Sequence, residues 1–191
     1  MADRLGDPTA RYAGRLTLNP IPHIDPFWSI LLPAVLLFTG SSVLFGAAKP
    51  VPVDFSNFRN LKRDMFLVAI VGPLTNFVLA ALAALTYLYV PNISEVGKEL
   101  LVETASLNLV LAIFNMIPVP PLDGSKVLAS ILGLFDRSLI YRFLELERFG
   151  FIILIVLLFS GVFYQILIPP YIYLITQMFG RFPPELLTSF F

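Results

Sequence analysis

The sequence predicts a polytopic α-helical membrane protein, and its composition and the distribution of its charges carry this prediction. Of the 191 residues, 57% are apolar and 14% are charged, whereas soluble domains average roughly 45–50% and roughly 25%. Four stretches contain no charged residue, at 26–48, 65–94, 104–122 and 149–180. Each comes close to or exceeds the roughly 20 residues that a helix needs to cross the hydrocarbon core.

Charge and residue usage exclude several classes of protein. Lysine plus arginine and aspartate plus glutamate both number 13, so the net charge is zero. The sequence therefore offers no basic excess for binding nucleic acid. It has no cysteine and a single histidine, His23, which excludes a disulfide framework and a zinc site built from several of its own thiolates or imidazoles. Metal chemistry must use oxygen ligands or an incomplete ligand set.

Three of the uncharged stretches predict full membrane spans. Residues Met65 to Val90 form the clearest span, because neighbouring helices can satisfy the carbonyl group that Pro73 frees. The span from Thr104 to Ile117 is expected to end where three prolines remove amide donors and unwind the chain. The span from Phe149 to Ile168 is expected to end because the Pro169-Pro170 pair interrupts the helix.

The stretch from residue 26 to residue 48 has two open topologies. Pro33 and the run Thr39 to Ser42 divide it into two short pieces, so it either crosses once or re-enters and returns. If it re-enters, the segments 1–25, 49–64 and 123–148, which carry eleven basic residues, all face the cytoplasm. A single crossing also obeys the positive-inside rule, but less well.

The end of the third uncharged stretch is a candidate functional site. It reads Asn115-Met-Ile-Pro118-Val-Pro120-Pro121-Leu-Asp123-Gly124. A carboxylate beside an unwound helix end is costly in or near hydrocarbon, which makes Asp123 a functional candidate. Freed carbonyl groups and the Asn115 amide can hold a polar ligand beside it. The alternative is that Asp123 caps a helix or turn at the membrane surface, and the residues alone leave both interpretations open.

Three weaker patterns accompany this site. In Gly72-Pro73-Leu74-Thr75-Asn76, the glycine permits close approach of another helix, and Asn76 can hydrogen-bond across the contact. The segment Arg15-Leu16-Thr17-Leu18-Asn19-Pro20 alternates polar and apolar residues, which predicts a small strand whose edge could bind an extended peptide. His23 precedes Asp25 by two residues, a spacing more typical of a surface turn than of a metal site.

In chain order, the motifs resemble the site-2 protease family of intramembrane zinc metalloproteases, and most closely its compact prokaryotic members without a peptide-binding PDZ domain. The resemblance covers about residues 2 to 135 and rests on Gly6-Asp7-Pro8-Thr9-Ala10, Gly14 to Pro20, His23-Ile24-Asp25-Pro26, Ala48 to Val53, Gly72 to Asn76 and Asn115 to Gly124. It implies a zinc ion held by two histidines of an H-E-x-x-H helix and by the aspartate of a later D-G motif, which falls on Asp123. The glutamate of the first motif is the implied general base.

The sequence departs from the family pattern at the catalytic motif. No H-E-x-x-H occurs in the 191 residues, and His23 lies in a different motif of the family. We therefore expect residues 1–191 to form a single membrane-embedded domain that is truncated at its N-terminus relative to the family. Such a chain would have no catalytic base, little bound zinc and no activity alone. Either the gene start was placed too far downstream, which the intact Asn115 to Gly124 motif favours, or the truncation is real.

The resemblance also bears on the uncertain topology. The missing helix would deliver its histidines near the cytoplasmic face, which Asp123 reaches after the two spans that precede it. The three ligands share one depth only if residues 26–48 cross an even number of times. We therefore expect Trp28 to Ala47 to be re-entrant, with the small strand around Arg15 to Asn19 near the cytoplasmic face.

The expected fold class is thus an all-α membrane bundle with a re-entrant segment and a small β element. The implied function is hydrolysis of a peptide bond in or near a prokaryotic cell membrane, with transmembrane or membrane-proximal proteins as substrates. Asp123 is the expected zinc ligand, and Asn115, Asn76 and His23 are expected to support it or to contact substrate. Two alternatives stay open: an inactive protein that binds transmembrane segments or regulates a protease, and a channel or carrier that uses Asp123 as a cation site.

Overall fold

The computed structural model of the protein describes residues 1–17, 19–39, 46 and 48–187, and the regular secondary structure in this part is helical. No strand occurs among these residues. They divide into two compact units, Met1–Asp64 and Met65–Phe191, which we describe separately. The all-helical class is confirmed, whereas the expectation of a single domain stays a prediction.

The first unit consists of short helices joined by irregular segments. Its elements are η1 (Ala2–Leu5), α1 (Thr9–Tyr12), η2 (Ile21–His23), η3 (Pro26–Leu31), α2 (Leu32–Phe38) and η4 (Phe55–Asn57). η3 and α2 are continuous, and together they rise at most about 20 Å, less than the roughly 30 Å of the hydrocarbon core. The expected re-entrant segment from Trp28 to Ala47 is not shown, since residues 40–45 and 47 lie outside the described residues.

The small strand expected around Arg15 to Asn19 is not shown either. Residues 15–17 and 19 have no regular structure, and residue 18 lies outside the described part of the chain. The Asn19 amide donates to Thr17 Oγ1 (3.1 Å), and the Ile21 amide donates to Asn19 Oδ1 (3.1 Å). These local bonds favour a turn, because a strand needs its amide groups for a partner strand.

A buried carboxylate joins two distant segments of the first unit. Asp7 is fully buried, and its oxygens accept hydrogen bonds from the amide and hydroxyl of Thr9, the Asp54 amide (3.0 Å) and the Asn57 side chain (3.1 Å). Gly6 precedes it with a φ of 113°, and a β-carbon there would lie 2.9 Å from the Asn57 carbonyl oxygen. The Gly6-Asp7 pair therefore fixes the N-terminal segment against η4.

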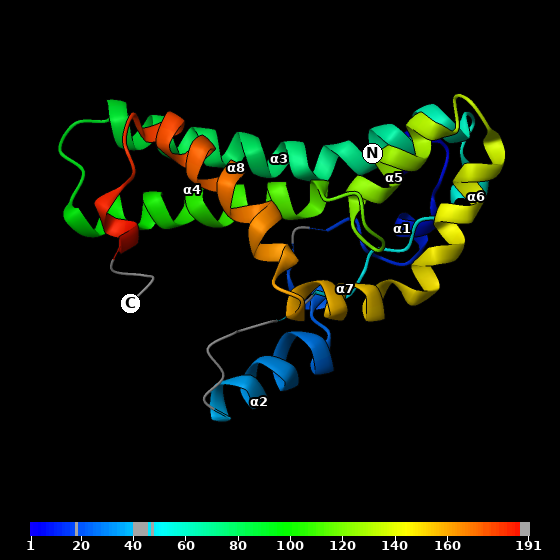
Figure 1. Ribbon diagram of the computed structural model, residues 1–191, viewed down its shortest axis with the longest axis horizontal. Helices are drawn as coiled ribbons and strands as arrows, with labels where there is room; N and C mark the ends of the chain where they lie inside the picture. Colours follow the sequence, from blue (N-terminus) through cyan, green and yellow to red (C-terminus); the bar gives the residue numbers. More distant parts are fainter. Residues whose placement is uncertain (18, 40–45, 47, 188–191) are drawn as a thin grey trace. The chain divides into compact units, whose positions relative to one another are not determined.

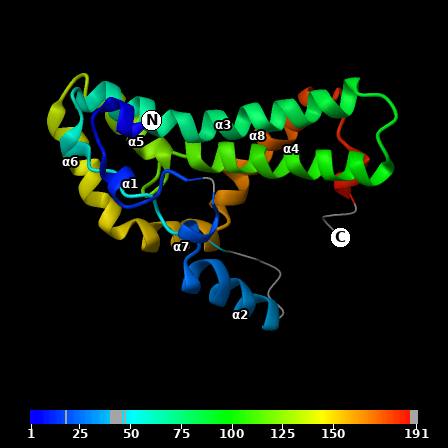
Figure 2. The same ribbon diagram turned by 180° about the vertical axis from the view of Figure 1, so that it is seen from behind.

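The second unit contains the long helices of the protein (Figure 1). Its elements are α3 (Leu61–Tyr89), which begins in the first unit, α4 (Glu95–Met116), α5 (Asp123–Leu132), α6 (Arg137–Leu146), η5 (Glu147–Phe149), α7 (Gly150–Phe159), α8 (Val162–Phe179) and η6 (Pro184–Leu187). Among the described residues, α3, α4 and α8 are long and apolar enough to cross a membrane. α3 and α4 lie side by side in both views (Figure 2).

Two of these helices begin earlier than the predicted spans. At the start of α3, Asn60 Oδ1 accepts from the Arg63 amide (3.2 Å) and Asp64 Oδ2 accepts from the Asn60 amide (2.8 Å). At the start of α4, Ser94 Oγ accepts from the Gly97 amide (3.2 Å). Polar and acidic side chains stabilise the first turn of a helix. The first residue of a charge-free stretch therefore marks where the apolar span begins, whereas the helix itself begins several residues earlier.

The predicted span from Phe149 to Ile168 is wrong as a single helix. The chain forms α7 and α8 instead, separated at Ser160 and Gly161, and the Pro169-Pro170 pair lies inside α8. Gly161 has a φ of 73°, a left-handed conformation that ends a helix and that glycine adopts at little cost. Prolines inside a membrane helix are tolerated where neighbouring groups satisfy the freed carbonyls. The glycine, and not the proline pair, sets the break.

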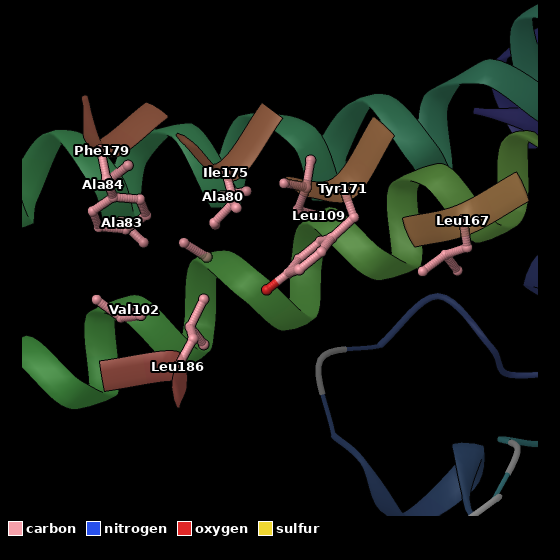
Figure 3. Packing of buried hydrophobic residues seen from close by; sticks show 11 residues of the cluster. Ala80, Ala83, Ala84, Val102, Leu109, Leu167, Tyr171, Ile175, Phe179 and Leu186 are labelled. Carbon is pink, nitrogen blue, oxygen red and sulfur yellow. The ribbon is translucent and has the colours of Figure 1, made fainter. Parts of the chain in front are cut away.

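Small residues on α3 allow three helices to share one core. Ala80, Ala83 and Ala84 of α3 are buried against side chains of α4 and α8, among them Leu109 and Ile175. Figure 3 shows these side chains gathered between the helices. Small residues permit the close helix approach on which packing within a membrane depends. A polar contact crosses the same core, because the Ser106 and Tyr171 hydroxyl oxygens lie 2.7 Å apart.

The Asp7 contacts predict an acid-sensitive first unit. Burial raises the pKa of the Asp7 carboxyl, but the hydrogen bonds from Thr9, Asn57 and Asp54 outweigh it and hold the pKa below 3.8. A lowered folded-state pKa gives stabilisation that is present above the unfolded pKa and lost as pH falls through the folded pKa. Exchange at the Asp54 amide, corrected for its intrinsic rate, should therefore accelerate only below about pH 4.

At neutral pH, Asp7→Ala should speed this exchange by about tenfold or more, because it leaves buried donors without an acceptor. Mass spectrometry of the peptide containing Asp54 provides the measurement. Asp3→Asn is the matched control, since Asp3 pairs with the exposed Arg11, and such pairs stabilise little. Equal exchange in the Asp7 and Asp3 variants would show that Asp7 does not hold the two segments together.

Candidate functional site

The chain unwinds between α4 and α5, as the three prolines predicted. α4 ends at Met116, and Ile117 is extended. The connection is a tight turn, in which the Val119 amide donates to the Ile117 carbonyl (2.8 Å) and the Leu122 amide donates to the Val119 carbonyl (2.9 Å). The Pro120-Pro121 peptide bond is cis. α5 then begins at Asp123, the acidic residue singled out from the sequence.

The glycine after Asp123 explains why the two helices meet so closely. A β-carbon at Gly124 would lie 2.2 Å from the Met116 carbonyl oxygen and 2.5 Å from that of Ile117. Both distances are far below van der Waals contact, so no side chain fits between α5 and the last carbonyl groups of α4. The Asp-Gly pair therefore begins α5 against the unwound end of α4.

A second glycine packs on the turn from α7. A β-carbon at Gly150, the first residue of α7, would lie 2.9 Å from Pro121 Cβ. The cis-proline turn is thus in close contact with helix backbone at both of these glycines. This packing holds the turn, and with it Asp123, in one position relative to α4 and α7.

The Asp123 carboxylate is half-buried between α5 and α3. Its Oδ2 lies 3.4 Å from the position that a β-carbon would take at Gly72 of α3, so the glycine leaves the carboxylate open on that side. Its Oδ1 lies 4.0 Å from Lys126 Nζ. Within the described residues, the carboxylate accepts no hydrogen bond and no side chain caps α5. The hydrogen bond that a helix cap requires is therefore not formed by Asp123 there.

Lys126 links this carboxylate to a second acidic residue. Its Nζ lies 3.0 Å from Glu147 Oε1 and donates to the Pro121 carbonyl oxygen at 3.3 Å. Burial raises the pKa of the Asp123 carboxyl, the Lys126 ammonium opposes this rise, and the Glu147 carboxylate adds to it. Neither partner was predicted from the sequence. The three-residue spacing of Asp123 and Lys126 on a helix could have indicated the first, but no local pattern indicates Glu147.

The other predicted site residues take different positions. Asn115 lies in the last turn of α4, and its side-chain amide donates to the Leu111 carbonyl (3.0 Å). Asn76 is half-buried on α3, one turn beyond Gly72 and so on the same helix face. Neither forms a hydrogen bond with Asp123 among the described residues. His23 belongs to the first unit, where its Nε2 lies 3.2 Å from the Thr17 carbonyl oxygen.

An apolar groove adjoins the unwound end of α4. It has a volume of about 460 Å³ and lies between α3, α4 and α8, lined by residues such as Pro73, Phe77, Met116, Pro118 and Pro170. Pro73 and Pro170 lie within helices, where each frees a carbonyl group one turn earlier. The groove therefore combines an apolar lining with irregular helix backbone, beside the turn that carries Asp123.

These features define a helical membrane protein whose candidate centre is a carboxylate held at a broken helix end. The profile of Peptidase family M50 matches residues 95–161, from α4 to the end of α7. "Putative zinc metalloprotease YwhC" of Bacillus subtilis is 35% identical over 168 residues, which cover 82% of this chain and 70% of that protein. The chain belongs to the M50 family, the site-2 proteases, whose members are intramembrane proteases.

Two further relatives are similar over a smaller share of their length. "Putative zinc metalloprotease Rip2" of Mycolicibacterium smegmatis is 27% identical over 158 residues, covering 82% of this chain and 58% of that protein. The protein of the same name from Mycobacterium tuberculosis is 34% identical over 126 residues, covering 65% of this chain and 47% of that protein. No solved structure gives a significant match to the chain.

The Gly124 contacts predict that alanine is not tolerated at this position. Gly124→Ala should destabilise the second unit by about 3 kcal/mol, at the upper end of overpacking costs, because the overlapping atoms belong to backbone. Thermal unfolding in detergent measures the loss. Gly72→Ala is the control, since its β-carbon would make an ordinary 3.4 Å contact. Equal unfolding temperatures for the two variants would contradict the packing described at the α4–α5 junction.

Proposed function

We propose that this chain forms the membrane-embedded part of a zinc-dependent intramembrane protease, in which Asp123 is one of the metal ligands. The observation that carries the proposal is the Asp123 carboxylate, half-buried at the broken end of α4 and without a hydrogen-bond donor among the described residues. An acidic group placed there at a cost in solvation indicates a function. The membership of the chain in a family of intramembrane proteases indicates the class of reaction.

The residues of the chain fit zinc as one ligand only. A carboxylate oxygen is a common zinc ligand, but a catalytic site uses three protein ligands, and the sequence holds one histidine, no cysteine and no H-E-x-x-H motif. The remaining ligands and the general base are therefore assigned to residues outside this sequence. When bound, zinc supplies Lewis-acid chemistry at the peptide carbonyl group.

The chain's own residues would bind and orient the substrate. A transmembrane helix must unwind before its peptide groups become accessible, since its amide and carbonyl groups are paired within the helix. The apolar groove between α3, α4 and α8 suits the side chains of such a segment. The edge of Arg15 to Asn19 would become a strand on pairing with the extended peptide, and a re-entrant Trp28 to Ala47 would bring this edge to the cytoplasmic face of a prokaryotic cell membrane.

The second candidate function is binding without hydrolysis. The apolar groove and the turn favour it, because they need no metal to hold a transmembrane segment. In this case the protein would retain such segments or regulate an intact protease. The two functions differ in whether a peptide bond of the bound segment is cleaved.

Asp123→Asn tests the proposed metal ligand. We expect the protein extended upstream, if translation in frame supplies His-Glu-x-x-His, to bind stoichiometric zinc and to cleave a membrane substrate. Asp123→Asn should lower zinc affinity by about 100-fold or more, since even residues that only orient ligands change it 10–100-fold. Metal analysis and a gel assay of cleavage provide the readouts. Asp136→Asn is the control, because Asp136 caps α6 and asparagine caps equally well.

Several outcomes of that experiment would contradict the proposed protease function. Unchanged zinc content in Asp123→Asn would show that Asp123 is not a zinc ligand. Binding of substrate without cleavage in the extended protein would support the second candidate function. Cation flux through liposomes that depends on Asp123 would instead support a channel.

The re-entrant topology has its own test. Epitope tags placed at residues 15 and 56 should be accessible from the same face of the membrane, because an even number of crossings separates them. Selective permeabilisation of cells followed by antibody labelling gives the measurement. Tags that are accessible from opposite faces would show that residues 26–48 cross once.

A further inference from the structure

Lys126 lies between two carboxylates and contacts them unequally. Its Nζ is 3.0 Å from Glu147 Oε1 but 4.0 Å from Asp123 Oδ1. The same ammonium donates a hydrogen bond to the Pro121 carbonyl oxygen at 3.3 Å. The contacts with Glu147 and Pro121 thus direct the Lys126 ammonium away from Asp123, which lies one helical turn earlier.

The pairing of Lys126 with Glu147 is held by burial. The Lys126 side chain is only 18% exposed, and the Glu147 Oε1 atom is buried with this ammonium as its ionic partner. Separating a pair of this kind leaves a buried charge uncompensated, which is far more costly than separating a surface pair. The exposed pair of Lys98 and Glu95 on α4, with a similar distance of 2.9 Å, lacks this constraint.

The 4.0 Å separation matters for what Asp123 can bind. A nitrogen and an oxygen form a hydrogen bond at about 2.7–3.2 Å, so Lys126 does not occupy the Asp123 oxygens. An ammonium in direct contact would instead compete with a divalent cation for the same oxygen atoms.

We propose that Glu147 is a positioning residue that holds Lys126 away from Asp123, so that the Asp123 oxygens stay open to a divalent cation. Without Glu147, the ammonium turns to Asp123 and closes the site. The inference rests on the proposed role of Asp123 as a metal ligand. It adds a function for η5, whose first residue is Glu147.

Zero-length crosslinking reads the position of Lys126 directly in the 191-residue chain. A carbodiimide joins an amine only to a carboxylate that it contacts, and mass spectrometry identifies the linked peptides. In the natural sequence we expect a Lys126–Glu147 link, and in Glu147→Gln a Lys126–Asp123 link. Glu95→Gln, the control at the exposed pair, should leave the Lys126–Glu147 link unchanged. A Glu147→Gln chain that gives no link to Asp123 would overturn the proposal.

Cobalt binding to the upstream-extended protein tests the consequence for the metal. Glu147→Gln should weaken cobalt affinity by about tenfold or more, the usual effect of residues that orient metal ligands. The double variant Lys126→Met/Glu147→Gln should bind cobalt nearly as tightly as the natural sequence, because the competing ammonium is gone. This recovery would also show that the weakened binding of Glu147→Gln does not come from misfolding.

Different results would contradict the role of Asp123 and the role of Lys126 and Glu147. If Asp123→Asn binds cobalt as well as the natural sequence, the proposed function is wrong, and the inference about Lys126 that rests on it falls too. If Asp123→Asn loses cobalt and Glu147→Gln does not, only the role of Lys126 and Glu147 is wrong. A double variant that binds as weakly as Glu147→Gln would also contradict competition by the ammonium.

Discussion

The contact between the first turn of α5 and the last carbonyl groups of α4 is the constraint on which the rest of the second unit depends. Only a residue without a side chain fits there, and Gly124 supplies it. The contact places Asp123 at the start of α5, opposite Gly72 of α3. It also places Lys126, one turn further along α5, where its ammonium pairs with Glu147. A short hydrophobic motif thereby fixes the geometry of three acidic and basic side chains.

The charge-free stretches predicted the existence of the long helices well and their limits poorly. Helix formation is local, so apolar runs of sufficient length identify α3 and α4. Their beginnings depend on capping by Asn60 and Ser94, which a charge count ignores. The break at Gly161 was not predicted, because the end of this span was placed at the Pro169-Pro170 pair. A helix in a bundle tolerates prolines, whereas a residue in the left-handed conformation ends it.

The candidate site was predictable only where its residues are close in the sequence. Asp123 stood out because three prolines unwind the chain directly before it. Glu147 and Gly150 belong to elements that only the tertiary fold brings to the turn, and nothing in their own neighbourhoods indicates this. The expected strand at Arg15 to Asn19 required a partner strand. Instead, the side-chain oxygens of Thr17 and Asn19 accept hydrogen bonds from backbone amides two residues further on.

The shortness of α7 has a consequence for hydration. Its ten residues rise about 15 Å, half of the hydrocarbon thickness, and its first residue packs on Pro121, two positions before Asp123. Lipids adjust to a short apolar element by local thinning of the bilayer. Thinning around α7 would bring headgroups and their associated water toward this turn. The hydrolysis proposed for this protein consumes water, and the short helix α7 beside the carboxylate would give that water a route to the site.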